Sequence, residues 1–90
     1  MKEIECIITG RVQLVLYRDF AQRRAWKHDL AGFVRNLPDG SVQVIARGDE
    51  DTLKRYVEEL KQGSMLSRVE NVSVSWREST KDYDGFSISY

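Results

Sequence analysis

The order of hydrophobic periodicities along this chain constrains its fold more strongly than any other feature. Apolar residues recur at helical spacing over about residues 18–29 and residues 50–62. Shorter segments that alternate apolar and polar residues, as strands do, cover residues 4–8, 32–36, 42–46, 72–76 and 86–90. The order β-α-β-β-α-β plus a final strand predicts one α+β domain over residues 1–90. We expect a ferredoxin-like sandwich, in which an antiparallel sheet carries two helices on one face and a short extra C-terminal strand.

Turn and capping patterns separate the predicted elements. Residues 37–40, Leu-Pro-Asp-Gly, predict a tight turn between the second and third strands, since proline presets φ and glycine tolerates a left-handed turn. Asp49 with its acidic neighbours predicts the start of the second helix, where acidic side chains suit the positive end of the helix dipole. Gly63 predicts its end.

A loop that begins with Gly10 and is flanked by Arg11 and Arg18 joins the first strand to the first helix. Amide N–H groups at the start of a helix lack partners within the helix and form a ready anion site. A guanidinium group can bind two oxygens of one phosphate. The stretch therefore predicts an anion-binding site that phosphate or sulfate would fit.

Residues 10–18, Gly-Arg-Val-Gln-Leu-Val-Leu-Tyr-Arg, resemble the acylphosphatase signature, Gly-Arg-Val-Gln-Gly-Val-x-Phe/Tyr-Arg. A second match covers residues 32–42, and weaker ones lie at residues 66–69 and 85–86. The matches follow the order of the family and cover nearly the whole chain. One position departs from the signature, because Leu14 stands where the family has its second glycine.

The resemblance implies a hydrolase that splits acyl phosphates, the mixed anhydrides of carboxylic and phosphoric acids, into carboxylate and phosphate. It implies that Arg18 and the loop amides hold the phosphoryl group, and that Asn36 is the catalytic asparagine that orients the attacking water. The loop residues concerned are Val12, Gln13, Leu14, Val15 and Leu16. The reaction implied in this way needs no metal or cofactor, and its partner is a small-molecule acyl phosphate.

Leu14 leaves the level of activity open. If the loop needs a positive φ at this position, leucine costs about 1–2 kcal/mol relative to glycine. If the loop relaxes instead, it moves an amide off the phosphoryl group, and losing one preorganised donor lowers a rate by roughly 10²–10³. The alternatives are a working but slowed acylphosphatase, an anion-binding protein of the same fold with weak or no activity, and a domain serving a larger acyl-transfer or carbamoyl-phosphate-handling assembly.

Charge and residue content argue against several other classes. The 14 basic and 14 acidic side chains balance, so no long-range field attracts nucleic acid or an anionic membrane. RNA-recognition domains share this element order, but the first and third strands here lack the aromatic residues on which bases stack. The single histidine, His28, and the single cysteine, Cys6, lie far apart, which argues against a metal site or a nucleophilic triad.

The remaining expectations concern location and packing. No apolar run is long enough to span a bilayer and no signal peptide is recognisable, so we expect a cytoplasmic monomer that binds no membrane. We expect Cys6 and His28 to be packing residues. Trp26 falls on the outer side of the first helix, where we expect charged neighbours to shield it.

Overall fold

The computed structural model describes residues 1–90 and contains the seven predicted elements in the predicted order. They are β1 (Lys2–Arg11), α1 (Tyr17–Lys27), β2 (Ala31–Asn36), β3 (Val42–Gly48), α2 (Glu50–Gln62), β4 (Arg68–Glu78) and β5 (Phe86–Ser89). The bounds of α2 agree with the prediction, whereas α1 begins and ends earlier than predicted. Strand β4 is longer than the predicted strand at residues 72–76, because its pairing with β1 continues beyond the alternating apolar residues.

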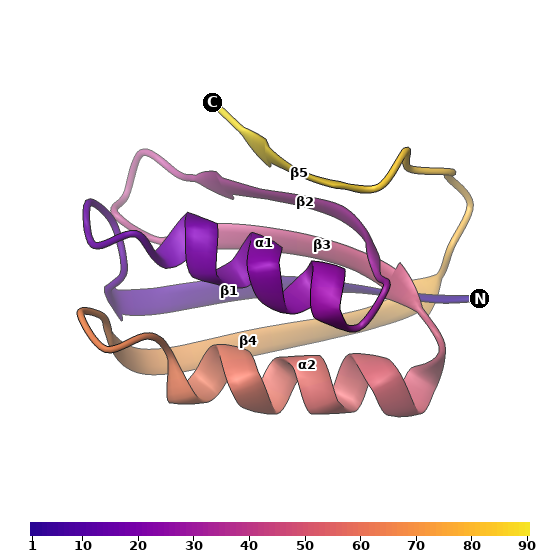
Figure 1. The fold of residues 1–90 in the computed structure, drawn as a ribbon, viewed down its shortest axis with the longest axis horizontal. Coiled ribbons are helices and arrows are strands. Elements are labelled where there is room, and N and C mark those ends of the chain that lie inside the picture. The colour runs from indigo at the N-terminus through magenta and orange to yellow at the C-terminus, as the bar shows by residue number, and fades with distance from the viewer.

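The strands form one sheet in the order β4-β1-β3-β2-β5, and both helices cover the same face of it (Figure 1). The predicted ferredoxin-like arrangement is therefore confirmed. One detail differs, because β5 pairs parallel with β2 and the sheet is mixed rather than antiparallel throughout. After β4 the chain crosses the uncovered face, where Tyr83 packs against Phe33 and Asp82 pairs with Arg47. It thereby reaches the opposite edge running in the direction of β2.

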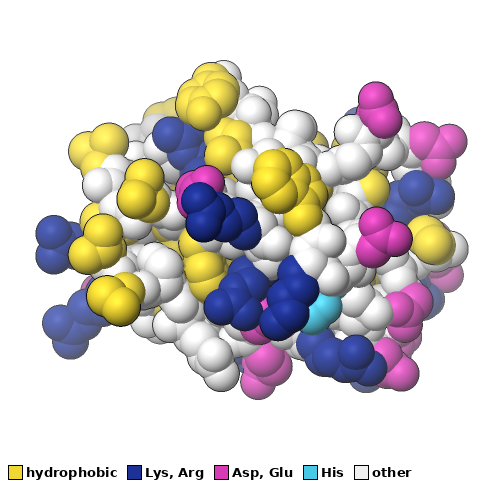
Figure 2. All heavy atoms as spheres, viewed as in Figure 1, with side chains coloured by type: hydrophobic (Ala, Val, Ile, Leu, Met, Phe, Trp, Pro, Cys, Tyr) yellow, Lys and Arg dark blue, Asp and Glu magenta, His cyan; other side chains and the backbone are white.

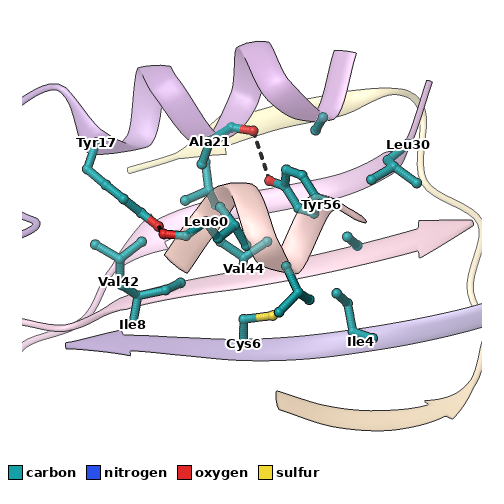
Figure 3. Packing of buried hydrophobic residues seen from close by; sticks show 14 of the residues in the cluster. Ile4, Cys6, Ile8, Tyr17, Ala21, Leu30, Val42, Val44, Tyr56 and Leu60 are labelled. Atoms are coloured by element: carbon teal, nitrogen blue, oxygen red, sulfur yellow. Dashed lines mark hydrogen bonds between the residues drawn. The ribbon is translucent and has the colours of Figure 1, made fainter. Parts of the chain in front are cut away.

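Two buried tyrosines tie the helices together across the core (Figure 3). The Tyr56 hydroxyl donates to the backbone carbonyl of Ala21 in α1, and the Tyr17 hydroxyl donates to that of Leu60 in α2, both at 2.8 Å. Burial raises the pKa of both phenols, so both stay protonated and can donate. Because Tyr17 is the first residue of α1, this bond fixes where that helix starts.

The core lies between the helices and the sheet. Cys6 points into it from β1 and is fully buried, and burial, with a smaller contribution from Glu5, raises the pKa of its thiol to about 12. Cys6 is thus a packing residue, as predicted. The other fully buried core side chains include Ile4, Ile8, Ala21, Ala25, Val34, Val42, Val44, Leu53, Tyr56 and Leu60.

Caps and outer side chains complete the fold. Asp49 caps α2 as predicted, by accepting a hydrogen bond from the Asp51 amide at 3.2 Å. The half-buried His28 ring binds the carboxylate of Glu59 in α2, so it packs between the helices. Trp26 is 58% exposed, so the expected shielding by charged neighbours is not seen; its indole N–H instead donates to the Phe86 carbonyl in β5 at 3.0 Å.

Candidate active site

Three connections meet at one end of the sheet: the loop from β1 to α1, the β2–β3 turn and the α2–β4 connection (Figure 1, left). Strand register brings them together. Val42 pairs with both Ile8 and Asn36, so the end of β2 lies in the same row as the end of β1. On the other side, Arg11 pairs with Arg68, so the chain leaving β1 lies beside the chain entering β4.

Gly10 allows the chain to leave β1 close to β4. Its φ is 124°, and the register between the two strands shifts between Thr9 and Gly10. A Cβ atom built on Gly10 would lie 2.1 Å from the carbonyl oxygen of Arg68, which no side chain can accommodate. A glycine is therefore required at this bulge, and it sets the direction of the loop that follows.

The loop alternates inward and outward side chains. Val12 and Val15 are buried, whereas the side chains of Leu14 and Leu16 are 98% and 70% exposed. Both leucines have a left-handed backbone, with φ of 61° and 62°, and Val15 between them does not. Alternation of left-handed and ordinary residues turns successive amides into a concave nest that suits an anion. The sequence left a positive φ at position 14 open, and no such expectation was made for position 16.

The amides of this loop are free to bind a ligand. No amide of residues 12–16 donates a hydrogen bond to the rest of the chain. Leu16 is the N-cap of α1 and provides no side-chain cap, so the first-turn amides also lack partners. The loop and the helix start together present a run of unpaired donors at the positive end of the helix dipole.

Arg18 adds a positive charge that no carboxylate neutralises, since it takes part in none of the ion pairs of the chain. Its guanidinium carbon lies 4.9 Å from the centroid of the Tyr90 ring, a cation–π contact. The neighbouring Asp19 pairs with Arg23 at 3.0 Å. Arg18 is therefore a free cation beside the start of α1. The contact with Tyr90 could not be predicted, because alternation in the last strand does not say beside which strand it lies.

Gln13 connects the loop to the end of β2. Its side-chain amide donates to the carbonyl oxygens of Leu37 and Ser41, at 2.9 and 2.8 Å, on the two sides of the β2–β3 turn. Asn36 precedes Leu37 directly, and its side-chain oxygen Oδ1 is buried without a hydrogen-bond partner. A buried acceptor without a partner costs free energy, and a ligand or water molecule that donates a hydrogen bond to it would remove that cost. Sequence reasoning considered only the backbone of Gln13 and missed this role of its side chain.

A hollow of about 430 Å³ lies beside the loop. Its lining combines loop residues, the start of α1 and the end of β5: Val12, Leu14, Leu16, Tyr17, Arg18, Asp19, Ile88 and Tyr90. The structure thus gathers Arg18 and three of the predicted loop residues around one space. Gln13, Val15 and Asn36 do not line it; Gln13 and Asn36 lie where the loop meets the turn, and Val15 is anchored in the core.

Three features of the rest of the molecule concern the metal, membrane and RNA classes. No three His, Cys, Asp or Glu side chains converge as metal ligands. Neither helix is long and apolar enough to cross a membrane. On the uncovered faces of β1 and β3, Glu3 accepts from Arg77 and Glu5 accepts from Gln43, both at 2.6 Å, and no aromatic ring is offered to a base.

Known proteins resemble this chain over its full length. The acylphosphatase family model matches residues 4–88. An acylphosphatase of Thermus thermophilus is 46% identical in an alignment that covers 87% of this chain and 89% of the relative. An acylphosphatase of Bacillus subtilis is 42% identical, and the alignment covers 100% of this chain and 99% of the relative. The crystal structure of acylphosphatase from Bacillus subtilis superposes with a TM-score of 0.97 at 42% identity over the whole of both chains. A full-length HypF structure matches at a TM-score of 0.84 and 26% identity, but over only 12% of that longer chain.

Proposed function

This chain belongs to the acylphosphatase family and is a hydrolase of that class, and we propose that it cleaves acyl phosphates with its β1–α1 loop, Arg18 and Asn36. The observation that carries the proposal is the set of unpaired amides at residues 12–16 beside an unpaired guanidinium. Such a site favours a group with several negatively charged oxygens on one centre, as a phosphoryl group has.

In this proposal the protein holds the phosphoryl group and orients the attacking water, and the reactivity comes from the substrate itself. A carboxylate is a good leaving group, so the bond from phosphorus to the acyl oxygen breaks without a strong general acid. The loop amides and Arg18 neutralise the phosphoryl oxygens as charge redistributes in the transition state. Asn36 accepts a hydrogen bond from the attacking water through Oδ1, the oxygen that has no partner within the chain. The bond from water oxygen to phosphorus forms, and the products are a carboxylate and inorganic phosphate.

The left-handed φ of Leu14 supports an active enzyme over a disabled anion-binding protein. The backbone at position 14 has the conformation that a glycine would favour there, and the bulky side chain points to solvent. The leucine is then a cost to the stability of the fold, and the arrangement of amides is kept. A slowed acylphosphatase remains the second candidate, and the Leu14→Gly comparison described below separates the two.

The test is steady-state hydrolysis of benzoyl phosphate with EDTA present. We expect Arg18→Ala and Asn36→Ala each to lower kcat/KM by roughly 10²–10³, as the loss of one preorganised donor or positioning group does. Arg11→Ala is the matched control, because Arg11 is exposed at the other end of the loop, and we expect its activity to match that of the wild type. A folded wild-type protein that does not hydrolyse benzoyl phosphate would contradict the proposal. Wild-type activity with full activity in Arg18→Ala would remove Arg18 from the mechanism.

A further inference from the structure

Exposed apolar side chains gather at the end of the molecule that carries the loop. Eight large apolar side chains are exposed, and five of them lie at this end. We call these five the apolar rim: Leu14, Leu16, Met65, Leu66 and Tyr90. Figure 2 shows hydrophobic side chains clustered at the left end of the molecule, around the β1–α1 loop and the α2–β4 connection, whereas charged side chains dominate the right end. A concentration of this kind on a small protein marks a binding surface.

Part of the rim borders a groove. A groove of about 470 Å³ lies between the start of α1 and the α2–β4 connection, a size that suits a small molecule. Its apolar walls are Val15, Leu16 and Phe20 on one side and Met65 and Leu66 on the other. The two sides come from segments about fifty residues apart, so neither periodicity nor motif predicts the groove.

The groove continues from the hollow beside Arg18. Leu16 and Asp19 line both spaces, so a ligand whose phosphoryl group lies at the loop can extend past Leu16 into the groove. This continuity favours a part of the substrate over an unrelated partner as the occupant. In an acyl phosphate, the part that extends away from the phosphoryl group is the acyl chain.

Charge selects the kind of acyl chain. Arg23 and Arg24 line the groove, but Arg23 pairs with Asp19 at 3.0 Å and Arg24 pairs with Glu59 at 2.9 Å. The guanidinium charges are therefore already matched, and the groove has no free cation for a carboxylate at the far end of a substrate. What it offers is apolar side chains, which favour an uncharged chain.

We propose that this groove binds the acyl group, and that the protein prefers acyl phosphates with an apolar acyl chain of several carbons. The proposal rests on the proposed function and deepens it by naming the substrate class. Complete burial of one methylene raises binding affinity roughly fourfold, and burial in a groove that is open along one side raises it about twofold per methylene. A preference of this origin grows with chain length.

The test is kcat/KM for acetyl, butyryl and hexanoyl phosphate in the wild type and in the double variant Met65→Ser, Leu66→Ser. These two residues lie outside the loop and belong to no part of the catalytic machinery described above. Hexanoyl phosphate has four more methylenes than acetyl phosphate, so we expect a rise of about sixteenfold in the wild type. In the double variant we expect kcat/KM to rise by about fourfold or less from acetyl to hexanoyl phosphate, and we expect its hydrolysis of acetyl phosphate to be unchanged. Trp76→Ser is the control, because it removes an exposed apolar side chain far from the groove and should keep the full dependence.

The outcomes separate the two proposals. A wild type that hydrolyses acetyl phosphate but shows no dependence on chain length overturns the groove proposal and leaves the proposed function intact. A dependence that the double variant keeps in full overturns it as well. A wild type that hydrolyses none of the three substrates overturns both. A wild-type dimer that the double variant converts to a monomer, without dependence on chain length, would assign the rim to contact between two copies of the chain.

Discussion

Leu14→Gly measures what the unusual leucine costs. Leu14 has φ of 61°, and a left-handed conformation costs a residue with a Cβ atom about 1–2 kcal/mol. Glycine removes that cost but also lowers the free energy of unfolding by about 0.5–1 kcal/mol, because it gives the unfolded chain more conformational freedom. The side chain is 98% exposed, so its loss removes no buried apolar area. We therefore expect a net gain of about 0.5–1 kcal/mol in the free energy of unfolding, or about 2–8 °C in Tm for a domain of this size.

The assay is thermal and urea unfolding followed by circular dichroism, with Leu14→Ala as the matched control. Alanine removes the bulk of the side chain but keeps the Cβ atom, so its stability should stay near that of the wild type. A gain that Leu14→Ala shares would show that the exposed side chain, and not the backbone, is responsible. Equal or lower stability in Leu14→Gly would refute the reasoning from φ.

The same variant decides between a competent and a slowed loop. If the leucine holds the amides in place, as proposed, kcat/KM of Leu14→Gly for benzoyl phosphate should stay within about tenfold of the wild type, since no donor is gained. If the leucine displaces an amide, restoring glycine should raise kcat/KM by roughly 10²–10³. A rise of that size would establish the slowed acylphosphatase as the correct description.

Three further predictions concern other parts of the chain. Gln13→Ala should lower kcat/KM by roughly 10–10², since the loop loses its link to the β2–β3 turn; unchanged steady-state kinetics would contradict this positioning role. Burial raises the pKa of Glu59, but hydrogen bonds from His28 and Arg24 outweigh it and hold the pKa below its usual value. The Glu59 carboxylate therefore contributes stability above that value, and this contribution is lost as pH falls through the lower folded pKa. In urea unfolding from pH 7 to 3, Glu59→Gln should lose less of its free energy of unfolding than the wild type does. Cys6 should react with DTNB at pH 8 at least about 10²-fold faster in urea than in the native protein, and equal rates would show that the thiol is accessible.

The relation to longer proteins follows from the same fold. The HypF structure contains this fold as 12% of its length, whereas the acylphosphatases of Bacillus subtilis and Thermus thermophilus match this chain almost from end to end. The β1–α1 loop, Arg18 and Asn36 all belong to the stretch from β1 to β2.

Hydrophobic periodicity determined the elements and their faces, because a helix or a strand places residues three to four or two positions apart on one side. Ile4 and Ile8 alternate along β1 and Ala21 and Ala25 recur at helical spacing in α1, and all four are fully buried. The motif around Arg18 indicated the position of the candidate anion site, since loop amides and the start of a helix depend on neighbours within a few residues. Local order in the sequence was sufficient for these features.

Tertiary structure decided the features that join distant segments. It placed β5 parallel to β2, and with it the Tyr90 ring beside the Arg18 guanidinium. It aimed the Gln13 side chain at the β2–β3 turn, and it closed an apolar groove between Leu16 and Met65. Each of these contacts depends on how whole strands and helices pack, and that packing minimises the free energy of the complete chain, which no short window of sequence contains.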